Sequence, residues 1–245
     1  MMRIRQAKYW ALSSMALRRV AVLPLTLLLN LPLGVPAAVA DEAQSAVVPA
    51  PEASDWRLDR ERDDIRIYTR AVPGSRFRAV RALMLTEYSM AQLVALIRDT
   101  AACPEWANLC KSSRVVDTLS ETELFIYTRN KLPWPISDRD AVAHVLWTVE
   151  DDGQVVRMSA TATEGRVPEV RGVTRLREAV TGWIFRRQPD GKIEVETHAH
   201  VDPAGPMPAW IINRLLLDAP HKTLLGMRRV LDEGRYRDAQ FGFLP

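Results

Sequence analysis

The chain has 245 residues, of which 33 are Lys or Arg and 30 are Asp or Glu, giving a formal net charge of +3. Five of the basic residues and none of the acidic ones fall within residues 1–40, so the rest of the chain carries 28 basic against 30 acidic side chains. No cluster of Lys or Arg remains there, which argues against a nucleic-acid-binding surface.

Residues 1–40 have the three-part pattern of a secretory signal peptide. A basic leader without acidic residues precedes an apolar run over Val20–Leu33, and Ala38-Val39-Ala40 forms a small-residue cleavage site. The apolar run has 14 residues, whereas a membrane-spanning helix needs about 20. An uncleaved anchor is the alternative, which the cleavage site disfavours. We therefore expect cleavage after Ala40 and export to the periplasm.

Residues 41–54 are rich in Ala, Pro and Val and lack periodicity, which is typical of a flexible linker. Residues 55–240 are then expected to form the folded domain. The chain contains two cysteines, Cys103 and Cys110, with six residues between them. In an exported protein such a pair can form a disulfide, and the alternative is two buried free thiols. The expected export favours the disulfide.

Alternation of apolar and polar residues with a period of two predicts strands over Asp64–Arg70 and Phe77–Thr86. The period then changes, and Ser89–Thr100 is predicted to be an amphipathic helix with Ser89 as its N-cap, ending before Pro104. The two-residue period returns in six further predicted strands, over 112–119, 123–132, 141–150, 154–162, 174–187 and 192–201. Hairpin signals at 151–153 and 189–191 indicate antiparallel pairing.

The last segment, Pro208–Glu233, has apolar residues at helical spacing and is predicted to be one long helix. Pro220 lies inside it and should kink or break it, because proline removes a backbone hydrogen bond and clashes with the carbonyl of Leu216. Gly234 is a plausible stop signal. A long antiparallel sheet needs a cover for its concave face, and this helix is the only element long enough to provide it.

Three segments carry a family resemblance. Lys131–Val142 reads Lys-Leu-Pro-Trp-Pro-Ile-Ser-Asp-Arg-Asp-Ala-Val and joins two predicted strands through a rigid Pro-Trp-Pro corner. Gly165–Arg175 ends in Pro-x-x-x-Gly-x-x-Arg, and His200–Asn213 leads into the last helix through Asp-Pro-Ala-Gly-Pro-Met-Pro-Ala-Trp. Together they resemble START domains, the steroidogenic-acute-regulatory-protein-related lipid-transfer modules, over roughly Trp56 to Arg237.

The resemblance implies an α+β fold of the helix-grip type, in which a curved antiparallel sheet of eight to nine strands is closed by the long C-terminal helix. It implies an internal cavity for one hydrophobic or amphipathic molecule, and a gate formed by the Gly165–Gly172 and Pro203–Pro208 loops. The residues expected at the cavity and gate are Ile126, Arg139, Val145, Val167, Pro168, His198, His200, Met207, Trp210, Ile211 and Leu215.

One departure from the family bears on the ligand. Cholesterol-binding members place a buried acid–base pair on the strands around the Arg-Asp motif, and by ungapped offset these positions fall near Ile126 and Val145 here. Sterol specificity is therefore not implied. Arg139 has two interpretations, namely an anchor for the Pro-Trp-Pro corner or a contact to a ligand headgroup, and we favour the anchor.

His198 and His200 lie two residues apart on a predicted strand and share a face with Asp202, so they are candidate metal ligands. With no further Cys or His nearby in the sequence, a polar stripe is the favoured interpretation, and no metal or cofactor is expected. Tryptophans at 106, 134, 147, 183 and 210 are expected mostly to pack in the core. Trp210 has a second interpretation, contact with a membrane interface.

No nucleophile elbow, zinc-protease, P-loop or dinucleotide-binding motif occurs. The strongest pair for an enzyme is His144 and Glu123, on neighbouring predicted strands. The sequence therefore predicts a non-enzymatic, exported lipid-binding protein. Its expected partners are a lipid or other hydrophobic small molecule and, transiently, a membrane surface, with no nucleic acid. The alternatives are a cavity-based cyclase or hydrolase of the helix-grip superfamily, and a ligand-sensing interaction module.

Overall fold

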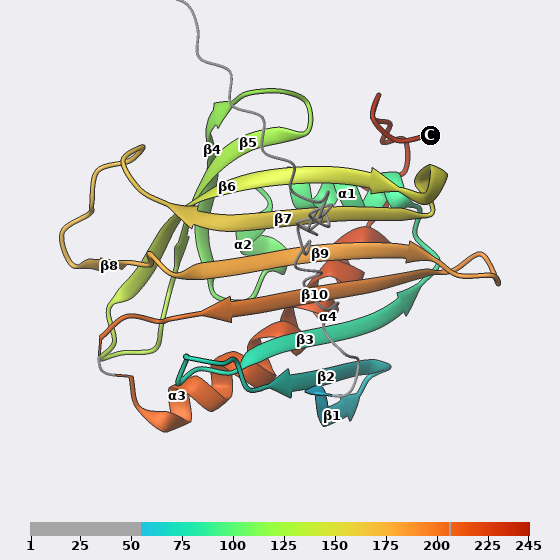
Figure 1. The fold of residues 1–245 in the computed structure, drawn as a ribbon. Helices are drawn as coiled ribbons and strands as arrows, with labels where there is room; N and C mark the ends of the chain where they lie inside the picture. The colour runs from blue at the N-terminus through green and yellow to red at the C-terminus, as the bar shows by residue number, and fades with distance from the viewer. Residues whose placement is uncertain (1–54, 206) are drawn as a thin grey trace, which may run out of the picture. The chain divides into compact units, whose positions relative to one another are not determined.

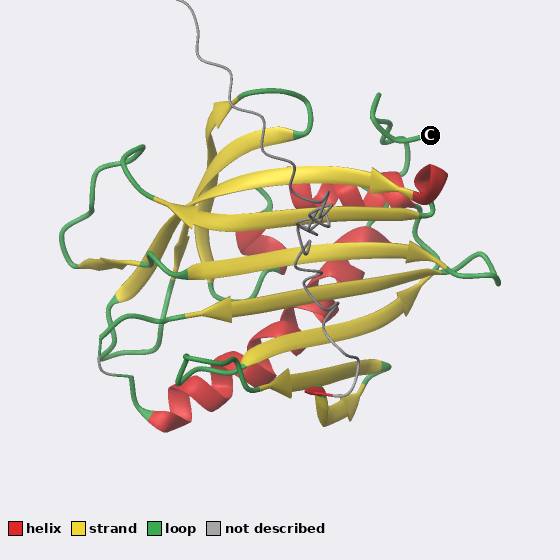
Figure 2. Cartoon of the chain, in the orientation of Figure 1, coloured by secondary structure: helices red, strands yellow, loops and turns green. Residues whose placement is uncertain are grey.

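A sheet of ten strands dominates the computed structural model, which describes residues 55–205 and 207–245 except the side chains of residues 209, 210 and 214 (Figures 1 and 2). The expected signal peptide and linker lie outside these residues. The strand order is β1-β2-β3-β10-β9-β7-β6-β5-β4, and the short β8 pairs with β6 in parallel. All other neighbours are antiparallel. The strands are β1 (Arg57–Arg62), β2 (Ile65–Arg70), β3 (Ala79–Thr86), β4 (Cys110–Thr118), β5 (Glu123–Asn130), β6 (Asp138–Glu150), β7 (Val155–Thr163), β8 (Val173–Arg175), β9 (Ala179–Arg187) and β10 (Ile193–Val201).

The sheet confirms the predicted α+β fold with two changes in its strands. The sequence analysis missed β1, because its sequence Arg-Leu-Asp-Arg-Glu-Arg has no apolar alternation. A charged strand of this kind suits the sheet edge where β1 lies, since charge discourages pairing with another chain. The single strand predicted over 174–187 is wrong, because it is divided into β8 and β9. The amide of Leu176 donates to the carbonyl of Asp140 at 2.7 Å, and this contact draws the preceding residues towards β6.

Two helices follow β3 as a short pair. In α1 (Met90–Arg98), Ser89 caps the N-terminus and forms a reciprocal capping box with Gln92, as the N-cap prediction required. The helix ends before Pro104, which occupies the first turn of a second helix, α2 (Cys103–Trp106), that was not predicted. Cys103 and Cys110 are joined by a disulfide, with their Cα atoms 6.0 Å apart, so α2 is tied to the first residue of β4.

The C-terminal helix is continuous but changes its winding. It begins as α3 (Ala209–Asn213), passes through the π-helical segment η3 (Arg214–Asp218), and continues as α4 (Ala219–Asp232). The wider π-helical turns end at Asp218, two residues before Pro220, the position at which the sequence predicted a kink or break. Gly234 follows the helix with a φ of +76°, which confirms it as the stop. None of the described helices is both long and apolar enough to span a membrane.

The helices lie on one face of the open sheet, behind it in Figure 1. Residues Leu224, Met227 and Val230 of α4 are fully buried and share a core cluster with apolar residues of β2, β3, β9 and β10. The close approach of α4 to α2 depends on Gly226, because a Cβ there would lie 2.2 Å from the carbonyl oxygen of Trp106. The sheet and the C-terminal helix thus enclose a common interior.

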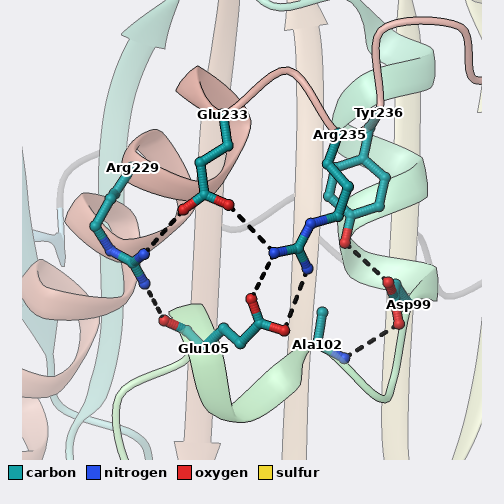
Figure 3. A network of polar contacts seen from close by, with 7 residues as sticks. All are labelled: Asp99, Ala102, Glu105, Arg229, Glu233, Arg235 and Tyr236. Carbon is teal, nitrogen blue, oxygen red and sulfur yellow. Dashed lines mark hydrogen bonds and ion pairs between the residues drawn. The ribbon is translucent and has the colours of Figure 1, made fainter.

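A C-terminal tail, residues 234–245, returns along α1 and α2 and is held by a polar network (Figure 3). Arg235 donates to both carboxylate oxygens of Glu105 at 3.2 and 2.7 Å, and the hydroxyl of Tyr236 donates to Asp99 at 2.9 Å. Burial and this hydrogen bond raise the pKa of Tyr236 to about 12. Beyond the network, Phe241 and Phe243 pack against the core cluster. The tail therefore completes one end of the domain.

Candidate ligand cavity

Small side chains cover part of the sheet face that looks towards the C-terminal helix. Strands bury alternate residues, and at several of these inward positions the sequence has alanine instead of a large apolar residue. The inward alanines that line the first of the two cavities described below are Ala141, Ala143, Ala160, Ala162 and Ala179. One row further along the sheet, Trp147, Met158 and Trp183 are opposite one another on β6, β7 and β9 and fill the same space. The alanines leave room between the sheet and the helices α1 and α2, and the large residues close this space off.

Two adjoining cavities result. The inward alanines line one cavity of about 270 Å³, which we call the alanine cavity. A second cavity, of about 330 Å³, lies between β10 and the C-terminal helix. Asn130, Leu176, Thr181 and Val201 line both, so the two spaces meet at these residues. Most of the lining side chains are apolar. This size and lining are typical of a site for a small ligand.

Polar side chains are few in these cavities. Asn130 and Thr181 stand where the two spaces meet, and their side chains make no hydrogen bond with any described residue. The alanine cavity is also lined by Arg98 at the end of α1, Thr100 in the turn after it and Trp106 of α2. Such sparse polar groups can orient an otherwise apolar molecule.

Arg139 and Asp140 of the Ser-Asp-Arg-Asp motif are both buried, 7% and 1% exposed. The guanidinium of Arg139 donates to the carbonyls of Pro203 at 2.8 Å, Ala204 at 3.0 Å and Ser137 at 2.7 Å. Burial lowers the pKa of Arg139. Its donors are thus used mainly on the loop after β10, in agreement with the anchoring role.

Asp140 holds the other predicted gate loop through Arg175. The carboxylate accepts from Arg175 at 2.8 and 3.2 Å and from the hydroxyl of Tyr127 at 3.0 Å. Arg175 in turn donates to the carbonyls of Val167 at 3.0 Å and Pro168 at 3.2 Å. The hydrogen bond that Arg175 donates to Asp140 raises the pKa of Arg175. The pKa of Tyr127 is raised mainly by burial and, second, by its hydrogen bond to Asp140. Neighbouring residues of β6 therefore secure two loops that are distant in the sequence.

The residues predicted for the site are only partly brought together. Ile126 and Val145 line the alanine cavity, and Arg139, His198 and Leu215 border the second. Ile211 is buried beside a small space that Leu215 also lines. None of the described cavities is lined by Val167, Pro168, His200 or Met207. The side chain of Trp210 lies outside the described part.

The histidines do not converge on a shared site. On β10, Thr197, His198, Ala199 and Val201 line the second cavity, whereas His200 lines none of the described cavities. His198 packs against Gly182, and His200 hydrogen-bonds to Ser75 at 3.1 Å. Among the described residues, no group of three His, Cys, Asp or Glu is arranged to hold a metal ion.

The pair considered for an enzyme also lies away from the cavities. His144 Nε2 and Glu123 Oε1 are 2.7 Å apart, with both side chains more than a third exposed. His144 is stacked on Phe125, at 4.8 Å between ring centroids. Neither member of the pair lines a described cavity.

Several lining residues were not identified from the sequence. The alanine pairs 141/143 and 160/162 carry a readable signal, because alanine at two successive inward positions of a strand leaves unfilled volume. Asn130, Thr181 and Leu176 carry no such signal, since each depends on which strands become neighbours. Trp134 was expected in the core, but its side chain is 90% exposed, at the cis peptide bond to Pro135.

Comparison with known proteins agrees with this architecture. The sequence model of the START domain matches residues 40–231. An uncharacterised protein of Pseudomonas aeruginosa is 29% identical over 181 residues, which cover 74% of this chain and 89% of the relative. The phosphatidylcholine transfer protein of Bos taurus is 26% identical over 171 residues, covering 67% of this chain and 78% of the relative.

A solved structure shares the fold at similar identity. The crystal structure of a STAR-related lipid transfer protein fragment from Xanthomonas axonopodis superposes with a TM-score of 0.66 and 27% identity, covering 73% of this chain and 99% of that one. The match of the family model to most of the chain, with this fold behind it, is decisive. The chain belongs to the START-domain family.

Proposed function

We propose that this protein is an exported lipid carrier, which binds one hydrophobic or amphipathic molecule between the sheet and the C-terminal helix and shields it from water across the periplasm. The observation that carries the proposal is the pair of adjoining, mostly apolar cavities, one bordered by α1 and α2 and the other by the C-terminal helix. Two relatives whose names refer to lipid transfer support the ligand class. No acid–base pair lines the alanine cavity in the described residues, which favours binding over turnover.

The energetic reason for a closed cavity is the cost of exposing hydrocarbon. Each CH₂ group moved from an apolar environment into water costs about 0.8 kcal/mol. A free lipid chain therefore leaves a membrane slowly, whereas a carrier that covers the chain removes most of this cost during aqueous passage. The alanine cavity and the adjoining cavity beneath the C-terminal helix would supply such a cover.

Loading requires an opening, and we place it at the two anchored loops. The loop after β10 is bound through Arg139, and residues 167–168 are bound through Arg175. Each attachment consists of a few hydrogen bonds to backbone carbonyls, so either loop can detach without unfolding the sheet. Glycines with positive φ at 165, 172 and 205 lie at these loops and tolerate such changes of the backbone.

Contact with a membrane is proposed to involve Trp134. Tryptophan prefers the interface between water and hydrocarbon, because its ring is amphipathic. Trp134 exposes 90% of its surface on the corner that leads into Arg139 and Asp140, the residues that hold both loops. Membrane contact at Trp134 would thus lie close in sequence to the elements that open.

Export is proposed from residues 1–40. Their basic leader, apolar run and Ala-x-Ala site are what a signal peptidase recognises. N-terminal sequencing of the protein recovered from the periplasm should begin at Asp41, and a product that retains Met1 in the membrane fraction would contradict cleavage.

The direct test fills the cavity. Ala143→Phe places a large ring among the inward alanines, and we expect it to reduce lipid extraction from labelled vesicles by at least about tenfold, since the chain and the ring compete for one volume. Val180→Phe is the matched control, because Val180 is exposed on β9, which β7 separates from β6, and the added ring points outward. Equal loss in both variants, or undiminished extraction by Ala143→Phe with an intact circular dichroism spectrum, would contradict binding in this cavity.

A further inference from the structure

Arg98 is the sole ionisable side chain that lines the alanine cavity in the described part of the chain. Its guanidinium donates to the carbonyl oxygen of Glu121 at 2.6 Å and lies over the rings of Phe241 and Phe243, at 5.4 and 5.7 Å from their centroids. None of the described carboxylates forms an ion pair with it. Burial lowers the pKa of Arg98, and the Coulombic attraction of Glu121 opposes this only in part, so its positive charge is partly desolvated and lacks an ion-pair partner among the described residues.

Trp106 adds an unused donor to the same cavity. Its side chain is 7% exposed and packs edge-on against Trp183, at 5.8 Å between centroids. The indole N–H is buried and has no acceptor among the described residues. A buried donor without a partner is unfavourable, and most such groups in folded proteins are paired. Trp106 therefore has the hydrogen-bonding capacity that a bound molecule would use.

Thr100 completes the set from the turn between α1 and α2. Thr100 lines the cavity, and its hydroxyl makes no hydrogen bond with another described side chain or backbone group. Arginine and the indole N–H can only donate, and a hydroxyl can donate as well. We call Arg98, Thr100 and Trp106 the donor cluster. It offers one positive charge and several hydrogen-bond donors to a space whose other lining side chains are mostly apolar.

We propose that the donor cluster binds the anionic oxygen headgroup, a carboxylate or a phosphate, of an amphiphile whose hydrocarbon chain lies along the inward alanines. The proposal rests on the proposed lipid-carrier function and adds the charge of the headgroup. Anionic oxygens accept hydrogen bonds from arginine in a planar, bidentate arrangement and neutralise its charge. A cationic headgroup would meet the like charge of Arg98, which Glu121 offsets only in part, in a space with few polar groups. An uncharged hydroxyl would satisfy single donors but leave the charge of Arg98 unpaired.

The experiment compares amphiphiles that share one saturated chain and differ only in the headgroup. Binding of the alkyl carboxylate, alkyl phosphate, alcohol and ammonium to the disulfide-intact protein is measured at pH 7.5 by displacement of a fluorescent lipid. We expect at least one anionic probe to bind about tenfold more tightly than the alcohol, and the ammonium to bind most weakly. The relative affinities of carboxylate and phosphate distinguish a fatty-acid-like from a phospholipid-like headgroup.

Two variants assign the preference to the donor cluster. Arg98→Gln should lose the preference for anions over the alcohol, and Arg98→Lys should retain part of the preference. Trp106→Phe, which keeps the ring contact but removes the N–H, should weaken anion binding several-fold. If native protein binds the alcohol and the anions equally, or if Arg98→Gln keeps the full preference, the headgroup assignment is wrong while lipid binding stands. If no probe binds, the carrier function itself fails.

Discussion

Arg139 and Asp140 are adjacent in the sequence, and each secures a different loop. Arg139 reaches the carbonyls after β10 directly, whereas Asp140 acts through Arg175 on residues 167 and 168. Alternation along β6 sends the two side chains to opposite faces of the strand, which is why one dipeptide can serve both loops. The sequence motif therefore encodes a pair of anchors at one end of a strand.

The buried ion pair between Asp140 and Arg175 gives a stability prediction. Asp140→Asn removes the carboxylate charge and leaves the guanidinium of Arg175 buried without a counterion. We expect a loss of about 3–5 kcal/mol in the free energy of unfolding, measured by urea denaturation. Glu150→Gln, which breaks the exposed pair with Arg157, is the control and should cost less than about 1 kcal/mol. A loss as small for Asp140→Asn as for the control would show that the pair contributes little.

His198 predicts an acid sensitivity with a definite sign. Burial lowers the pKa of His198 below its ordinary value of 6.5, and the attraction of Glu196 only partly opposes this while Arg157, Arg186 and Arg70 add to it. Below pH 6.5 the unfolded chain binds a proton at this residue more readily than the folded one. Folding stability from His198 is therefore fully present above pH 6.5 and is lost as the pH falls towards the lowered pKa.

The measurement compares the urea stability of the native protein and His198→Gln at pH 8.5, 7.5 and 5.5. The native protein should lose more stability than the variant between pH 7.5 and 5.5, and the two should differ by a constant amount between pH 8.5 and 7.5. Parallel curves across the whole range would show that His198 does not titrate differently in the folded state.

At the scale of elements, periodicity predicted most strands and both principal helices, because half-buried strands and amphipathic helices bury residues at fixed spacings. The edge strand β1 escaped, since a strand with neither face in the core has no apolar pattern. The division between β8 and β9 depends on the contact of Leu176 with Asp140, 36 positions earlier, which no local pattern contains. The change to π-helical winding before Pro220 was signalled by the proline alone.

Gly226 gives the prediction for this scale. In an exposed helix interior, alanine is favoured over glycine by about 1 kcal/mol. Here the added Cβ would lie 2.2 Å from the carbonyl oxygen of Trp106, so α4 and α2 must separate. We expect Gly226→Ala to be destabilising by about 1–3 kcal/mol in thermal or urea unfolding. Lys222→Ala, at an exposed position of the same helix, should change stability by less than about 0.5 kcal/mol. A stabilising Gly226→Ala would show that the two helices have room to move.

At the scale of the molecule, the fold was more predictable than the site. Sheet, helix and family followed from patterns and motifs that are local in the sequence. The cavity lining depends on which strands lie side by side, and Asn130 and Thr181 meet only because β5, β6, β7 and β9 are consecutive in the sheet. Of the two histidines, His198 borders a described cavity, whereas the side chain of His200 contacts Ser75 instead.

Trp134 connects the whole molecule to a membrane in the proposed function. Trp134→Ala should reduce partitioning of the protein onto vesicles by about tenfold or more, because a large apolar side chain no longer enters the interface. Binding of a soluble short-chain ligand should stay unchanged. Leu119→Ala is the control, since Leu119 is also exposed but belongs to the turn between β4 and β5. Unaltered vesicle binding in Trp134→Ala would place the membrane contact elsewhere.

The pairing of β3 with β10 has a consequence for how the chain is made. The first three strands form a meander whose next partner is the last strand, so more than a hundred residues must be synthesised before that edge is covered. Contacts between such distant residues slow folding, because the intervening chain must be ordered first. Slow folding of a newly made chain would suit the proposed export. A chain that stops before residue 193 leaves two sheet fragments with open edges that can pair with other chains.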